Sequence, residues 1–115
     1  MDPQMPYDES LADRVRETLS KSPEVVERKM MGGLVFMVNQ HMCCGVTGTS
    51  LMVRVGKDAY EKSLAKPNVS PLDIGGGRQP KAFVLVAPEA IKNKKSLQSW
   101  IKKGLAFVET LPAKK

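Results

Sequence analysis

The sequence is poor in aromatic residues, contains one histidine and two cysteines, and has no long hydrophobic run. A helix that spans a bilayer needs about 20 consecutive apolar residues, which no stretch of this chain approaches, so we expect no membrane segment. The two cysteines, Cys43 and Cys44, are adjacent and do not form the disulfide framework of a small secreted domain. The first ten residues are acidic and polar, so we also expect no signal peptide. Together these absences predict a cytoplasmic protein.

The same scarcity restricts the chemistry that the chain can support. A structural zinc site needs about four ligands, and His41 with two adjacent cysteines does not supply them, because neighbours on a strand point to opposite faces. We recognise no Ser, His and Asp set of the kind that activates a nucleophile. The glycine-rich run 75–78 matches neither common phosphate-binding pattern, so we interpret it as a connector between strands. We therefore expect no metal, no cofactor and no enzymatic activity.

The length of 115 residues predicts a single domain with a core of its own. We expect this domain at residues 7–112, between a loose N-terminal arm at 1–6 and a basic tail at 113–115. The net charge of +6 is unevenly placed, because six Lys and Arg face seven Asp and Glu through Val55, whereas twelve face five beyond it. A basic second half of this kind can indicate an anionic partner.

The rest of the chain is organised around residues 30–55, which we interpret as a three-stranded antiparallel meander. Two-residue loops between β-rich runs indicate hairpins, and Asn39-Gln40 and Gly48-Thr49 provide such loops. The expected strands are 34–38, 41–47 and 50–55.

Loops at these positions determine which residues of neighbouring strands lie opposite each other, and we state the resulting register as a hypothesis. Phe36 would lie opposite Cys43, and Cys43 opposite Arg54, while Cys44 would lie between Val35 and Val53. Because side chains alternate along a strand, one face is uniformly apolar and is expected to be the core. Its members are Val35, Met37, Met42, Cys44, Val46, Leu51, Val53 and Val55. The mixed face is expected to be half-covered or solvated, and its members are Leu34, Phe36, Val38, His41, Cys43, Thr47, Ser50, Met52 and Arg54.

The flanking segments predict three helices and up to three further strands. Apolar residues recur at helical spacing in 8–20 and from Asn93 or Ser96 to Leu111, and 57–66 suits a short helix. Strands are expected at 24–31 and 82–87, and at 69–74 only as an edge strand or loop, because it contains Pro71. The order α-β-β-β-β-α-β-(β)-α indicates an α+β fold, with a mostly antiparallel sheet and the helices on its apolar face.

Three short motifs carry a resemblance to a known family. They are Met31-Gly32-Gly33 before the first apolar strand, Met42-Cys43-Cys44-Gly45, and Leu51-Met52-Val53-Arg54-Val55-Gly56. On these motifs, and on similarity from Tyr7 to Pro112, the sequence resembles the TfoX N-terminal domain family. The resemblance implies a compact α+β fold like that of secretion-chaperone-type domains. The namesake of the family regulates natural competence and carries a second, C-terminal domain, which we do not expect in this sequence of 115 residues. The resemblance supplies no catalytic residues.

Cys43 is the candidate for a reactive or redox-sensing thiol. In the expected register Arg54 lies across from Cys43 and His41 lies on the same face, and a neighbouring cation lowers the pKa of a thiol. The alternative is a half-buried thiol that packs on Phe36. Cys44 is expected to be a small buried apolar residue.

Two surfaces are candidates for binding a partner. Phe36, Met52 and Arg54 on the mixed sheet face form the candidate interaction surface, since Met suits adaptable contacts. Lys92, Lys95, Lys102 and Lys103 form a candidate basic patch, although no aromatic side chains interleave with them as in single-strand-binding platforms.

Our leading hypothesis is a non-enzymatic regulatory domain that binds a protein partner through the mixed sheet face or an open strand edge, with a homodimer as one form of such contact. The alternatives are a nucleic-acid-associated regulator that uses the basic last helix, and a thiol-based sensor or enzyme at Cys43.

Overall fold

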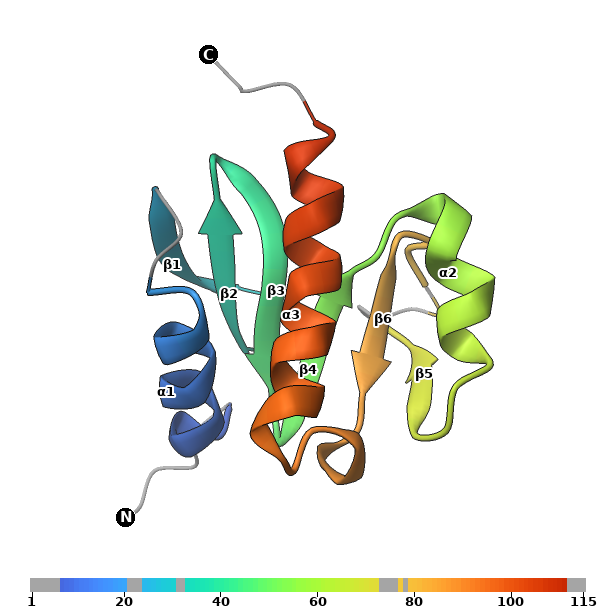
Figure 1. Ribbon diagram of the computed structural model, residues 1–115, viewed down its shortest axis with the longest axis horizontal. Coiled ribbons are helices and arrows are strands. Elements are labelled where there is room, and N and C mark those ends of the chain that lie inside the picture. The colour runs from blue at the N-terminus through green and yellow to red at the C-terminus, as the bar shows by residue number, and fades with distance from the viewer. Residues whose placement is uncertain (1–6, 21–23, 31–32, 73–76, 78, 112–115) are drawn as a thin grey trace.

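The computed structural model describes residues 7–20, 24–30, 33–72, 77 and 79–111. It contains three α-helices, one short 3-10 helix and six strands (Figure 1). In chain order these are α1 (Glu9–Thr18), β1 (Val25–Met30), β2 (Gly33–Val38), β3 (His41–Thr47), β4 (Ser50–Arg54), α2 (Lys57–Leu64), β5 (Val69–Pro71), β6 (Phe83–Val86), η1 (Pro88–Ala90) and α3 (Lys94–Glu109). The predicted α+β class and the predicted order of elements are confirmed.

The six strands form one antiparallel sheet in the order β1-β2-β3-β4-β6-β5. α3 crosses the middle of the sheet over β3 and β4, with α1 at the β1 side and α2 beside β5 and β6 (Figure 1). All three helices contribute side chains to one buried cluster on this face, which includes Val15, Tyr60 and Ile101. We call this side of the sheet the helix-covered face and the other side the open face.

The first and last helices, α1 and α3, begin where the sequence provides a side-chain cap. The Asp8 carboxylate accepts hydrogen bonds from the backbone N–H of Ser10 and of Leu11, which satisfies two free donors at the start of α1. Asn93 caps α3 in the same way through the N–H of Ser96. The apolar stripe of α3 is buried against the sheet, and its buried residues are Leu97, Trp100, Ile101, Gly104 and Val108.

The first hairpin contains a β-bulge that the predicted register lacks. Next to the turn, the predicted pairs Met37 with Met42 and Val38 with His41 are present. Beyond them Phe36 pairs with Cys44 and Val35 with Gly45, so the predicted pairings of Phe36 with Cys43 and of Val35 with Cys44 are wrong. Because two residues of β3 then oppose one residue of β2, Cys43 has no partner of its own in the ladder. The two-residue turn itself is as predicted, since Asn39 has a φ of 53° and Gln40 a φ of 71°.

The bulge reverses the predicted faces of β2. The main core on the helix-covered face takes Leu34, Phe36 and Val38, which were expected on the mixed face. Val35, Met37 and Met42, expected in this core, pack instead on the open face. The second hairpin keeps its predicted register, with Cys44 opposite Val53, so Cys44, Val46, Leu51, Val53 and Val55 face the core as predicted.

The two sheet edges differ in length. β5 has three residues and ends at Pro71, which agrees with the expectation that a proline confines this segment to an edge. β1 has six residues and forms the other edge. The expected arm at 1–6, the tail at 113–115 and most of the connector at 75–78 lie outside the described residues.

Candidate functional site

Cys43 and Cys44 are both fully buried on the helix-covered face. Their exposed fractions are 0%, because the bulge turns Cys43 as well as Cys44 into the core under α3. A hydrogen bond with Cys43, together with burial, raises the pKa of the Cys44 thiol well above its ordinary value. Neither thiol is therefore presented to solvent.

The structure buries two members of the expected reactive group, Cys43 and His41, and leaves the third, Arg54, half-buried. His41 is buried at the start of β3, and Arg54 lies at the end of β4 with its guanidinium directed to the carbonyl oxygen of Met42, at 3.4 Å. A reactive thiolate must be both ionised and accessible. The burial of Cys43 thus argues against a thiol-based sensor or enzyme.

The expected interaction surface of Phe36, Met52 and Arg54 is not one surface. Phe36 is 0% exposed in the main core, whereas Met52 is buried on the open face and Arg54 is half-buried. The bulge separates Phe36 from the other two, because it moves the side chains of β2 to the opposite face. The open face therefore has to be defined from its own residues.

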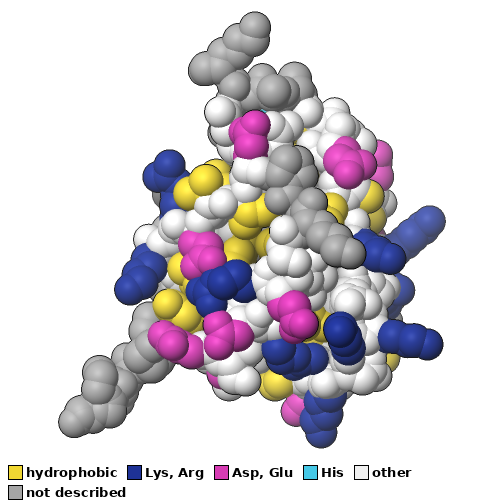
Figure 2. Space-filling model, turned by 60° about the vertical axis from the view of Figure 1, so that its left-hand side comes forward, with side chains coloured by type: hydrophobic (Ala, Val, Ile, Leu, Met, Phe, Trp, Pro, Cys, Tyr) yellow, Lys and Arg dark blue, Asp and Glu magenta, His cyan; other side chains and the backbone are white. Residues whose placement is uncertain are grey.

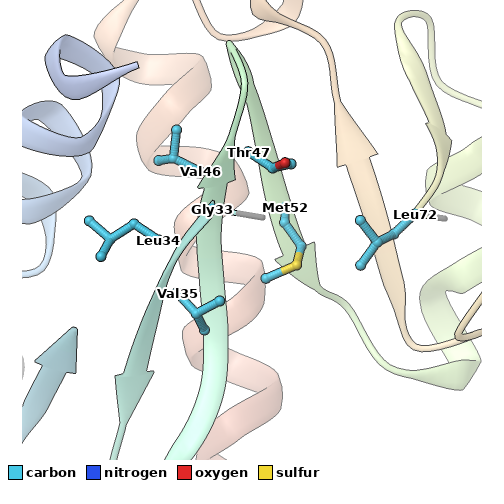
Figure 3. Close-up of a pocket in the computed structure, with 7 residues that line it drawn as sticks. All are labelled: Gly33, Leu34, Val35, Val46, Thr47, Met52 and Leu72. Atoms are coloured by element: carbon cyan, nitrogen blue, oxygen red, sulfur yellow. The ribbon is translucent and has the colours of Figure 1, made fainter. Parts of the chain in front are cut away.

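A second apolar cluster lies on this open face. Val35, Met52 and Leu72 form its buried centre, and the half-buried residues around them are Met37, Met42, Phe83 and Leu85. No helical residue belongs to the cluster in the described part of the chain. Figure 3 shows Val35, Met52 and Leu72 around a narrow apolar hollow of about 10 Å³ between β2, β3 and β4, which has room for about one water molecule. This hollow is too small for an organic ligand.

A wider hollow on the open face lies beside β1. It has a volume of about 210 Å³, and its lining residues are Glu24, Val26, Arg28, Met37 and Gln40. Val26 is 50% exposed and is the one large hydrophobic side chain exposed to this degree among the described residues. Val26 was not a predicted site residue, although it lies in the predicted first strand. We call these five residues the β1 hollow.

Arg54 lies between two aromatic rings that were not predicted as site residues. Its guanidinium carbon is 5.6 Å from the centre of the Phe83 ring on β6 and 5.3 Å from that of Phe107 on α3. Cation–π contacts at this distance attract a cation to the ring face. An arginine inside the apolar run 51–55 was the available indication in the sequence that this position is unusual.

The four lysines of the candidate basic patch lie on the surface. Lys92, Lys95, Lys102 and Lys103 are all exposed on α3 or just before it. The ammonium groups of Lys66 and Lys103 each lie 5.7 Å from the centre of the Trp100 ring, so the end of α2 adds a further cation to the patch. Basic side chains project along the right-hand edge of the view in Figure 2.

The described residues contain no group of three or more His, Cys, Asp or Glu side chains that could hold a metal ion. None of their helices is long and apolar enough to cross a bilayer. Fold and surfaces thus define a small α+β domain with a six-stranded antiparallel sheet and helices packed on one face of it. The family model of the TfoX N-terminal domain matches residues 17–108, and the chain belongs to this family. Comparisons with curated proteins and with solved structures found no match.

Proposed function

We propose that this chain is a regulatory protein-interaction domain, not an enzyme, and that it binds a protein partner at the β1 hollow and the adjacent edge of β1. The observation that carries the proposal is the 50% exposure of Val26 on an edge strand. An apolar side chain beside a hollow and an unpaired strand edge is suited to an extended segment of a partner.

The backbone of β1 supports this mode of binding. The N–H of Asn39 donates to the carbonyl oxygen of Glu24, so residue 24 and every second residue after it bond to β2. The backbone groups of Val25, Glu27 and Lys29 therefore point away from the sheet, and no other described strand pairs with them. A partner strand would pair with these backbone groups of β1, and one of its side chains would enter the β1 hollow.

Affinity capture with matched baits tests the proposal. The wild-type chain, Val26→Asp and Ala106→Asp serve as baits, because Ala106 is an exposed apolar residue on α3, away from β1. A partner that wild type and Ala106→Asp retain and Val26→Asp loses supports the proposal, and sedimentation of the purified chain reports whether a second copy is that partner. Identical capture by all three baits, with no self-association that depends on Val26, contradicts it.

The basic patch supports a second candidate, binding to nucleic acid. Four exposed lysines lie on or just before one helix, and Lys66 extends the patch at Trp100. Phosphate contacts of this kind give an affinity that falls steeply with salt. Titration of a DNA duplex at two salt concentrations tests this candidate, with Lys95→Gln/Lys102→Gln/Lys103→Gln as the variant. The absence of binding at the lower salt concentration eliminates it.

A further inference from the structure

We propose that Arg54 anchors a binding site for a small organic acid, a molecule with one carboxylate on an apolar body. The site is the hollow between the end of β4, the start of α2 and the side chain of Phe107, which we call the Arg54 pocket. It lies outside the β1 hollow, so the proposal does not depend on the function proposed above.

The guanidinium of Arg54 is held in place but incompletely bonded. Its carbon lies 5.6 Å from the centre of the Phe83 ring and 5.3 Å from that of Phe107, and its one hydrogen bond to a described residue is the long contact from Nη1 to the carbonyl oxygen of Met42, at 3.4 Å. Its Nε is buried and has no acceptor, and no carboxylate pairs with Arg54 among the described residues. A buried N–H donor such as this Nε is ordinarily paired, because a missing partner costs free energy. The guanidinium of Arg54 can therefore donate further hydrogen bonds to an anion.

The Arg54 pocket provides a mostly apolar space beside the guanidinium that is large enough for a small molecule. Its volume is about 470 Å³, within the range of small-molecule sites. Its lining residues besides Arg54 are Val55, Gly56, Lys57, Asp58, Ala59, Ala82 and Phe107. Most of these present apolar surface, which suits the body of an organic molecule, while Arg54 and Lys57 supply positive charge.

Gly56 allows this arrangement at the point where β4 passes into α2. Its φ is 87°, which favours glycine, and a Cβ at this position would lie 2.5 Å from the Phe107 ring. The absence of a side chain lets Phe107 approach the start of α2 and cover Arg54. Gly56 is also the N-cap of α2 and provides no side-chain acceptor, so the first N–H groups of the helix add partial positive charge to the pocket.

The charges favour a carboxylate over a phosphate. Asp58 in the first turn of α2 lines the same pocket and repels a dianion more than a monoanion. One guanidinium fork matches the two oxygens of a carboxylate. A neutral amide of the same shape lacks the charge that pairs with Arg54, and a phosphate lacks the apolar body.

Titrations of the full chain with benzoate, benzamide and inorganic phosphate test the proposal, monitored by ¹H–¹⁵N NMR. We expect benzoate to give saturable shifts of the Arg54 side-chain N–H and of the amides of Lys57 and Asp58, and benzamide to give none. Equal responses to benzoate and benzamide, or phosphate shifts without benzoate shifts, would overturn the assignment of a carboxylate. Both comparisons use the wild-type protein, so they do not depend on the folding of any variant.

Variants then locate the site. Arg54→Gln is expected to weaken benzoate binding roughly tenfold or more, because it removes the charged fork. Lys103→Gln is the matched control, since it removes another cation that lies over an aromatic ring, outside the pocket. Unchanged affinity in a folded Arg54→Gln protein, judged by its dispersed amide spectrum, refutes the role of Arg54.

Discussion

Gly104 of α3 lies directly over Cys43 of β3. A Cβ at Gly104 would stand 2.8 Å from the Cys43 carbonyl oxygen and 3.1 Å from its sulfur. The bulge brings Cys43 toward the helix, and the missing side chain at residue 104 accommodates it. The longest helix, α3, therefore packs closely on the β-bulge of the first hairpin.

Replacing Gly104 should destabilise the domain. Alanine is ordinarily the better helix former by about 1 kcal/mol. Here its methyl group meets backbone that cannot move cheaply, so we expect Gly104→Ala to lower the free energy of unfolding by about 1–3 kcal/mol. Urea unfolding followed by circular dichroism measures the change, with Ser99→Ala at an exposed position of α3 as the control. A Gly104→Ala protein more stable than wild type would show that α3 does not approach β3 this closely.

The buried thiols should react slowly in the native state. Cys43 and Cys44 are 0% exposed, so a reagent reaches them only when the structure opens. We expect labelling with a chromogenic disulfide to be slow in buffer and to accelerate in urea. Thr49→Cys adds a thiol at an exposed turn position and should contribute one rapidly reacting equivalent. Rapid labelling of the wild-type protein would restore the hypothesis of a reactive Cys43.

Stability should fall in alkaline solution. The pKa of Cys44 is raised in the folded state, so this thiol stays neutral at a pH where it ionises in the unfolded chain. The contribution of Cys44 to the free energy of unfolding is complete below the ordinary thiol pKa of about 8.5. It decreases as the pH rises above this value, by at most about 1.4 kcal/mol per pH unit. Urea unfolding under reducing conditions measures this slope. Cys44→Ala should show a smaller slope over the same range, and an identical slope would assign the effect to other groups.

The ion pair between Arg16 of α1 and Glu27 of β1 should contribute little to the stability of the fold, and only above acidic pH. Arg16 donates to both carboxylate oxygens of Glu27, and its hydrogen bonds lower the pKa of Glu27. The contribution is therefore present above about pH 4.3 and is lost as the pH falls through the lowered pKa. Both side chains are partly exposed, so we expect Glu27→Gln to cost about 0.5 kcal/mol at neutral pH. Urea unfolding at pH 7 and pH 3 tests this, with the exposed Glu17→Gln as control; a difference equal at both pH values would contradict an ionic origin.

Local sequence patterns were sufficient for most elements of the fold. Turn residues at Asn39-Gln40 and Gly48-Thr49 located both hairpins, and Pro71 identified an edge strand. Apolar spacing located the helices, since it is a property of a few neighbouring residues.

The bulge at Cys43 was not predictable from the same patterns. Two cysteines in succession are equally compatible with alternation and with a bulge that turns both inward, and the choice depends on how α3 packs at Gly104. A shift of one residue then reversed the faces of β2 and moved Phe36 out of the predicted surface. The rings around Arg54 come from β6 and α3, so sequence proximity could not reveal them either.

The unequal edges of the sheet limit how copies of this domain can associate. A short strand that ends in proline, beside α2, offers few donors to an incoming chain, whereas β1 presents its full length. If two copies paired edge to edge through β1, each would use the longer of its two sheet edges. Such pairing would end at two subunits and would leave only the short edges that end at Pro71, so it would not extend into a fibril.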